Sequence, residues 1–211
     1  IDLNLMITGW RQQLINNTQY IDAKFDIADL QITNEGVSWN EIQANRILFC
    51  DGIASMENPY FKMLPFAPNK GEALIVEIKD LPNQAIYKNN MTIVPWKDQL
   101  FWVGSNYDWE FTDTKPSIDF RNKMEMALRQ LLKIPFIVVD HIAGIRPANQ
   151  ERRPFVGLHP SYPAIGICNG MGTKGCSLAP YFAHQLIAHC EQGSPIHPEA
   201  SLERFEQILK K

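Results

Sequence analysis

The sequence predicts an α+β protein, in which an antiparallel sheet and several helices occupy different stretches of the chain, or else a mixed sheet with two regions. Three patterns lead to this prediction. A helix and short strands come first, alternating strand-like segments fill residues 71–107, and the last third passes through helix, strand, glycine turn and helix. Because short turns join the strands of the middle stretch, they are expected to form an antiparallel meander.

The first element is an amphipathic helix, because Asp2 is a typical N-cap and apolar side chains from Leu3 to Leu14 lie on one helical face. Short strands follow over residues 20–25, 27–32 and 37–39, with a turn at 34–36. Residues 46–50 read Arg-Ile-Leu-Phe-Cys. Such an unbroken apolar run is typical of a parallel or central strand that is covered on both faces.

The middle of the chain begins with a loop over residues 55–68 that contains three prolines. Strands are then predicted over residues 71–79, 84–95 and 100–107. A strongly amphipathic helix over residues 119–133 ends at Pro135, and a strand over 136–142 follows.

Residues 144–161 are rich in proline and arginine and are expected to be irregular. A short strand at 164–168 leads into a glycine loop and then into a helix over 178–192. Pro180 is tolerated in the first turn of that helix, and Gly193 lies just past its end. The last helix is predicted over residues 198–209.

The composition excludes several classes of protein. The 211 residues carry a formal net charge of -3, which does not match the basic surface of a nucleic-acid-binding protein. No apolar run approaches the ~20 residues of a membrane helix, and no secretion signal is present at the start. These features predict a cytoplasmic protein. The four cysteines and five histidines lack metal-ligand spacing, so we expect buried free thiols and no metal site.

The densest candidate site is the segment Asn169–Gly175, between a strand and a helix. Its three glycines allow a ligand to approach the backbone, and the N–H groups at the start of the helix suit an anion or an electron-rich oxygen. The alternative is a tight connection that needs a positive φ.

Two further segments carry candidate residues. Arg146, in Gly144-Ile145-Arg146-Pro147, is placed to form a forked pair with a carboxylate. The alternative is a structural pair with an aspartate or with backbone carbonyls. The apolar strand at 47–50 ends in a turn of small residues that can pass close to a cofactor.

In their order and spacing, these segments make the chain similar to the D-amino-acid oxidase superfamily of FAD-dependent oxidoreductases, which includes glycine oxidase and sarcosine oxidase. The resemblance covers nearly the whole chain, to the closing Arg204-Phe205. The motifs are Asp51-Gly52 after an apolar strand, Lys70-Gly71-Glu72, Val103-Gly104-Ser105, Gly144-Ile145-Arg146-Pro147, Arg153-Pro154-Phe155-Val156-Gly157 and Asn169-Gly170-x-Gly-x-x-Gly175.

The resemblance implies a two-part organisation. Residues 1–55 and 144–211 correspond to part of an FAD-binding domain, and residues 56–143 to a substrate-binding antiparallel sheet domain. It also implies that Arg146 binds the substrate carboxylate and that the glycine loop lies over the pyrimidine side of the flavin. The implied cofactor residues are Asp51, Gly52, Ile53, Gly170, Gly172, Thr173, Lys174 and Gly175, and no side chain is expected to act as a catalytic base.

The chain departs from the family pattern in three places. Asn169 stands where a histidine is common, and Asp51 stands where an alanine is common. The N-terminal Gly-x-Gly-x-x-Gly unit, which holds the ADP half of FAD, is missing from this sequence. We therefore expect the chain alone to bind FAD weakly or not at all. The apolar surface that this unit would cover, near the first helix and residues 46–50, is expected to be exposed or to form a homodimer contact.

The resemblance thus implies FAD-dependent oxidation of the C–N bond of an amino acid or a secondary amine, with the chain as a fragment of the enzyme. Two alternatives stay open. One is a binding or scaffold module that kept the fold and lost catalysis. The other is a flavin dehydrogenase that passes electrons to a carrier instead of oxygen.

Overall fold

A computed structural model describes residues 2–33 and 35–210. The chain forms two compact units. Residues 1–66 and 147–211 make up the first, here called the terminal unit, and residues 67–146 make up the second, the middle unit. The sequence placed the two divisions at 55/56 and 143/144. In the structure they lie at 66/67 and 146/147, so the whole strand that ends in Arg146 belongs to the middle unit.

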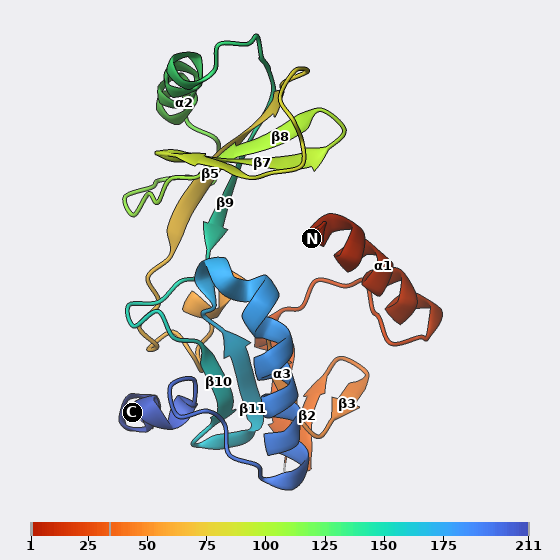
Figure 1. Ribbon diagram of the computed structural model, residues 1–211. Coiled ribbons are helices and arrows are strands. Elements are labelled where there is room, and N and C mark those ends of the chain that lie inside the picture. Colours follow the sequence, from red (N-terminus) through yellow and green to blue (C-terminus); the bar gives the residue numbers. More distant parts are fainter. Residues whose placement is uncertain (1, 34, 211) are drawn as a thin grey trace. The chain divides into compact units, whose positions relative to one another are not determined.

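The middle unit is an antiparallel five-stranded sheet with one helix packed against it (Figure 1). The strand order is β6-β7-β8-β5-β9. Helix α2 begins after its N-cap Ser117 and buries Phe120 and Leu128 in a core with apolar side chains of β5, β7 and β8. The bounds are β5 (Asn69–Glu77), β6 (Tyr87–Asn89), β7 (Met91–Lys97), β8 (Leu100–Gly104), α2 (Ile118–Leu131) and β9 (Ile137–Arg146).

This unit confirms the predicted antiparallel strands and the helix, but the strands do not follow one another as a simple meander, because β5 pairs with β8 and β9 and not with the strand that comes next in the sequence. Strand boundaries also differ from the prediction. The predicted strand over 84–95 is two strands, because Asn90 has a φ of 51° and turns the chain between β6 and β7. The predicted strand over 136–142 continues to Arg146, because β9 pairs with β5 along its whole length, ending with Asn69 opposite Arg146.

A buried carboxylate joins three elements of the middle unit. Glu72 on β5 is 1% exposed and accepts hydrogen bonds from the backbone N–H of Ser117 at 2.6 Å and from its hydroxyl at 2.7 Å. The Nε2 atom of His141 on β9 lies 3.0 Å from Oε2 of Glu72. Burial lowers the pKa of His141, although the Glu72 carboxylate opposes this shift. Glu72 therefore holds the start of α2 against β5 and β9.

The terminal unit contains a mixed three-stranded sheet in the order β10-β11-β4 (Figure 1). Strand β4 (Ile47–Phe49) runs parallel to β11 (Tyr162–Asn169), which confirms the predicted parallel strand. Strand β10 (Phe155–His159) is antiparallel to β11. Helix α3 (Gly175–Gln192) packs on one face through Phe182 and Leu186, and a second apolar cluster around Phe61 and Phe155 covers the other.

The terminal unit has further elements outside this sheet and α3. They are α1 (Leu3–Asn16), the antiparallel β1 (Leu30–Thr33), β2 (Gly36–Trp39) and β3 (Ile42–Ala44), and the closing helical turns at Leu202–Phe205 and α4 (Glu206–Leu209). The predicted strand at 20–25 is wrong, β3 was not predicted, and the predicted helix at 198–209 is limited to these turns. The irregular stretch expected at 144–161 contains β10. The predicted turn at 34–36 includes position 34, which lies outside the described residues.

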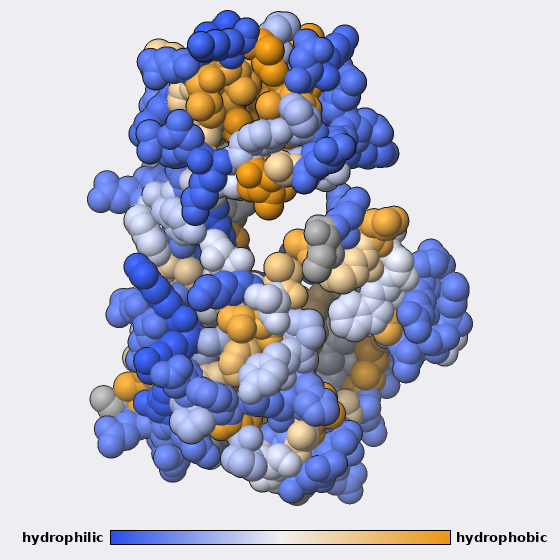
Figure 2. Space-filling model, in the orientation of Figure 1, coloured by the Kyte–Doolittle hydropathy of each residue, from blue (hydrophilic) through white to orange (hydrophobic). Residues whose placement is uncertain are grey.

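Helix α1 exposes its apolar side chains. None of its residues, all of which the structure describes, is buried, and Leu5 and Trp10 are 74% and 63% exposed. Figure 2 shows hydrophobic residues on the surface of this helix. In contrast, Ile47 and Leu48 of β4 are half-buried and Phe49 is buried. Exposed apolar surface was expected near the first helix and near residues 46–50. The structure shows it on α1, whereas the apolar residues of β4 are half-buried or buried.

Across residues 2–33 and 35–210, no helix has both the length and the apolar character that a bilayer span requires.

Candidate active site

The predicted cofactor residues lie in two loops of the terminal unit that leave the sheet from neighbouring strands. Asp51, Gly52 and Ile53 follow β4 and enter the helical turn Gly52–Met56, whereas the glycine loop follows β11. Because β4 and β11 are parallel and paired, both loops start from the same edge of the sheet. This edge, at the carboxyl ends of parallel strands, is where open α/β sheets usually bind ligands.

Asn169 connects the two loops. It is 5% exposed, and its Nδ2 atom donates to the carbonyl oxygen of Gly52 at 2.7 Å and to the hydroxyl of Ser55 at 2.9 Å. Its Oδ1 atom accepts from the N–H of Gly170 at 2.8 Å. The Ser55 hydroxyl also donates to the carboxylate of Asp51. Asparagine can serve both loops because its amide has a donor end and an acceptor end.

The sequence placed Asn169 in the glycine segment and marked it as a departure from the family pattern, but it did not predict this connecting role. The available signal was a polar side chain with both donor and acceptor groups at the end of an apolar strand. Asp51 was another departure, and its carboxylate accepts from Ser55 inside this network.

Several amides of the glycine loop are engaged within the protein. The N–H of Gly172 donates to the carbonyl oxygen of Pro147 at 3.2 Å, and that of Lys174 donates to Met171 at 3.0 Å. With the bond from Gly170 to Asn169, three of the predicted backbone donors have partners in the chain. Thr173 and Lys174 are exposed, so their side chains are accessible at the start of α3.

The structural need for a glycine differs among the three glycine positions of this loop. Gly170 has a φ of +76°, and a Cβ there would lie 2.9 Å from both the Asn149 side chain and the Phe155 ring. Gly172 also has a positive φ, of +53°. Gly175 has a φ of -52°, and a Cβ there would meet no atom within 4 Å. The backbone therefore explains Gly170 and Gly172 but leaves Gly175 without a structural reason.

This difference predicts opposite effects of two alanine substitutions. Gly170→Ala should lower the free energy of unfolding by about 1–3 kcal/mol, because it combines a positive φ with close contacts. Gly175→Ala, in the first turn of α3, should leave it unchanged or raise it by up to about 1 kcal/mol. Chemical denaturation of both variants, with Gly9→Ala in α1 as a helical control, measures this. A loss of stability in Gly175→Ala as large as in Gly170→Ala would contradict it.

Arg146, the predicted carboxylate-binding residue, belongs to the middle unit and is the last residue of β9. Its Nη1 atom donates to Oδ1 of Asn69 at 2.7 Å and to the carbonyl oxygen of Asn106 at 3.1 Å. Its Nη2 atom donates to the Ser105 hydroxyl at 3.0 Å. The guanidinium carbon lies 4.7 Å from the centre of the Tyr107 ring, within cation–π range.

The guanidinium lies directly across the backbone of β5. A Cβ built on Gly71 would lie 1.9 Å from Nη2 of Arg146, so only glycine leaves room for this conformation. Gly71 belongs to the Lys70-Gly71-Glu72 motif of the family resemblance, and its contact with Arg146 gives that motif a physical role.

Arg146 is held by neutral groups only. Among the described residues, no carboxylate lies within ion-pair distance of its guanidinium. A guanidinium has five N–H donors, and the three bonds above use three of them. The remaining two suffice for a bidentate carboxylate. The alternative from the sequence was a structural pair of Arg146 with an aspartate or with backbone carbonyls. Among the described residues, Arg146 pairs with no aspartate, but it does donate to the carbonyl oxygen of Asn106.

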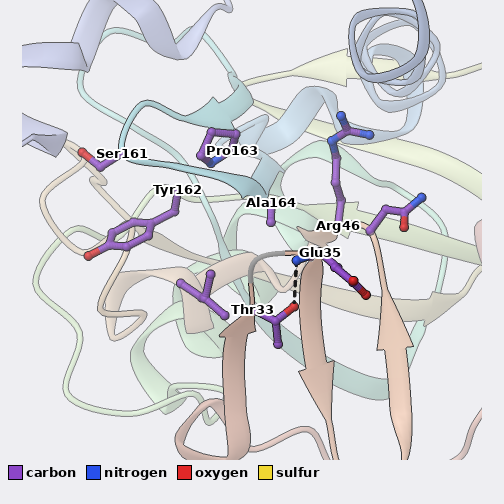
Figure 3. Close-up of a pocket in the computed structure, with 10 residues that line it drawn as sticks. Thr33, Glu35, Arg46, Ser161, Tyr162, Pro163 and Ala164 are labelled. Atoms are coloured by element: carbon purple, nitrogen blue, oxygen red, sulfur yellow. Dashed lines mark hydrogen bonds between the residues drawn. The ribbon is translucent and has the colours of Figure 1, made fainter.

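The terminal unit also has an open surface pocket of about 360 Å³. Arg46 and Ala164 line it together with Thr33, whose Oγ1 atom accepts from the N–H of Glu35 at 3.3 Å (Figure 3). The lining residues that the structure describes include none of the predicted cofactor residues. Among residues 2–33 and 35–210, no group of three side chains is placed to hold a metal ion.

Known proteins resemble this chain in sequence and in fold. Glycine oxidase from Bacillus subtilis (strain 168) is 31% identical over 149 residues, which cover 66% of this chain and 39% of the relative. Iminodiacetate oxidase from a Chelativorans species superposes with a TM-score of 0.65 at 21% identity, over 84% of this chain and 51% of that structure. L-proline dehydrogenase from P. horikoshii has a TM-score of 0.65 at 18% identity, over 84% and 53%.

The chain thus spans about two fifths of the curated glycine oxidase and about half of these two solved structures. The two structural matches, both below 25% identity, establish the fold. The family assignment rests on the sequence, because the profile described as FAD dependent oxidoreductase matches residues 13–189. This match includes Arg146, both loops and all the predicted cofactor residues, and on this basis the chain belongs to the FAD-dependent oxidoreductase family.

Proposed function

We propose that this chain supplies the substrate-binding sheet and the flavin-facing loops of an enzyme that oxidises the C–N bond of an amino acid or a secondary amine. The observation that carries the proposal is the Arg146 guanidinium, which has no acidic partner among the described residues and has two N–H donors to spare. FAD, when bound, supplies the hydride acceptor of this reaction.

The proposed role of Arg146 is to bind and orient the substrate carboxylate. Asn69, Ser105 and the carbonyl of Asn106 fix the plane of the guanidinium, so little conformational freedom is lost when a carboxylate binds. Tyr107 lies against the cation. A carboxylate held in this way fixes where the substrate Cα lies, which is one part of the positioning that hydride transfer requires. No side-chain base is needed if the amine binds in its neutral form.

The proposed flavin contacts are the loop after β4 and the glycine loop. Asp51, Gly52 and Ile53 contribute the first, and Gly170, Gly172, Thr173, Lys174 and Gly175 contribute the second. Thr173 and Lys174 at the start of α3 offer an N–H group, a hydroxyl and an ammonium to an electron-rich ring oxygen. Gly175, for which the fold gives no structural reason, fits a position where a ligand approaches the backbone.

We further propose that tight FAD binding needs a dinucleotide-binding segment in addition to these 211 residues. The chain alone should therefore lose added FAD on desalting, and a polypeptide that joins it to such a segment should stay yellow with a flavin absorption band. In the flavin-loaded protein, Gly175→Ala should weaken FAD binding by about tenfold or more, whereas Gly9→Ala should not change it. Absorption spectra and FAD titrations of these variants provide the measurement.

The same preparation separates the proposal from its alternatives. An amino-acid or amine substrate should bleach the flavin band, and hydrogen peroxide should appear when oxygen is the acceptor. Bleaching without peroxide would indicate a dehydrogenase that uses a carrier. A joined polypeptide that folds but retains no flavin would contradict the proposal and favour a scaffold module.

A further inference from the structure

Two cysteines lie opposite one another where β4 and β11 end. The last pair of these parallel strands is Ile167 with Phe49, and the next residues are Cys168 and Cys50. Residues in register on neighbouring parallel strands direct their side chains to the same face of the sheet. Leu48, two residues before Cys50, and Cys168 both pack against the cluster beneath α3, so this face is the α3 side.

The spacing of neighbouring strands suits a covalent bond between these residues. Paired strands lie about 4.8 Å apart, which falls inside the range of roughly 4.4–6.8 Å between Cα atoms that a disulfide bridges. All four cysteines of the chain are free thiols, as the sequence predicted. The predicted burial is wrong, because Cys50 and Cys176 are exposed and Cys168 and Cys190 are half-buried.

The two thiols of the pair differ in their chemistry. A hydrogen bond from the Cys168 thiol lowers the pKa of Cys50 to about 7, although burial and the neighbouring Asp51 carboxylate oppose the shift. The pKa of Cys168 is raised by the same hydrogen bond, by burial and by the charge on Cys50. Cys50 is therefore the nucleophile at neutral pH, and Cys168 is a protonated neighbour.

We propose that Cys50 and Cys168 form a hydroperoxide-reactive pair that closes into a reversible cross-strand disulfide. The Cys50 thiolate attacks hydrogen peroxide, the O–O bond breaks, and Cys50 becomes a sulfenic acid as hydroxide leaves. The sulfur of Cys168 then attacks the Cys50 sulfur, the S–O bond breaks, and the Cys168 proton leaves with the hydroxyl group as water. Two thiols are oxidised to one disulfide, and one peroxide is reduced to two water molecules once the hydroxide is protonated.

The first step removes an obstacle to the second. Once Cys50 is a sulfenic acid it no longer carries the negative charge that raises the pKa of Cys168. The Cys168 thiol then loses its proton more readily, and it already lies beside the sulfur that it must attack. A resolving thiol next to an exposed thiolate of low pKa is the arrangement of redox-sensitive cysteines.

The disulfide would connect the starts of the two candidate flavin loops. Cys50 immediately precedes Asp51, and Cys168 immediately precedes Asn169. The bond would thus add a covalent link to the hydrogen bonds that Asn169 makes between the loops. This reactivity does not rest on the proposed function, because added peroxide provides the oxidant and the proteins are compared without FAD.

The test uses the reduced 211-residue chain, treated with a small excess of hydrogen peroxide, alkylated and digested for mass spectrometry. The expected product is monomeric, lacks two hydrogen atoms, contains a Cys50–Cys168 cross-linked peptide and returns to the free thiols with dithiothreitol. Cys176→Ala should behave as the wild type. Cys168→Ala should stop at a sulfenic acid on Cys50 that a dimedone probe traps, and Cys50→Ala should leave Cys168 reduced.

The rate of alkylation supplies a second readout that does not require the disulfide to form. At pH 7 the Cys50 thiol should react with iodoacetamide roughly fivefold faster in the wild type than in Cys168→Ala, because only the wild type has the hydrogen bond from Cys168. Oxidation first at Cys176 or Cys190, disulfides only between chains, or equal alkylation rates in these two proteins would overturn the proposal.

Discussion

Replacing Arg146 with alanine is expected to raise the KM for an amino-acid substrate by about 100-fold in the flavin-loaded protein. The substitution removes a charged group with two N–H donors for the carboxylate, and bonds to charged groups contribute about 1.5–3 kcal/mol each. The effect should be confined to carboxylate substrates, so amines without a carboxylate should show little change. Steady-state kinetics on matched substrates with and without the carboxylate measure the difference.

Two further variants separate the role of Arg146 in binding from a role in folding. Gly71→Ala retains the charge but places a Cβ where Nη2 of Arg146 now lies, so it should also raise KM. Arg121→Ala, which removes a half-buried arginine that pairs with Glu125 on α2, should leave KM unchanged. Thermal unfolding of each variant shows whether the fold is retained. A folded Arg146→Ala protein with unchanged KM would remove the proposed carboxylate-binding role.

Replacing Glu72 with alanine is expected to lower the free energy of unfolding of the middle unit by about 3–5 kcal/mol, the cost of removing one partner of a buried ionic group. The N–H and hydroxyl of Ser117 would lose their acceptors. The Lys70 ammonium, which is 3.9 Å from Glu72 and 6% exposed, would lose its buried counter-charge. Urea denaturation followed by a probe of the antiparallel sheet measures the change.

Glu77→Ala is the matched control for this substitution, because it removes a carboxylate from the same strand at a site where the side chain is 31% exposed. Its expected effect is below about 1 kcal/mol. Glu72→Gln should fall between the two, since the amide keeps one acceptor oxygen but loses the charge. Similar losses for Glu72→Ala and Glu77→Ala would show that Glu72 does not hold α2 and β9 together.

The elements that the sequence predicted well are those whose periodicity is local and strong. Helix α2 was found within two residues at each end because its apolar residues recur with helical spacing and Pro135 stops it. The apolar run at 46–50 correctly indicated a parallel strand. The failures lie where pairing with a distant strand decides the structure. Residues 143–146 extend β9 only because β5 is there to pair with them, and β10 forms in a stretch rich in proline and arginine because β11 lies beside it.

The candidate site divides in the same way. The order of short motifs along the chain identified the family and singled out Arg146 and the glycine loop, because each is a local pattern that a reader of the sequence can see. Only the tertiary structure decided that Asn69 and Ser105 hold Arg146, that Asn169 joins two loops, and that Cys50 faces Cys168. These partners are tens of residues or more apart in sequence. Propensity and periodicity act within a few residues, whereas strand register and burial bring distant side chains together.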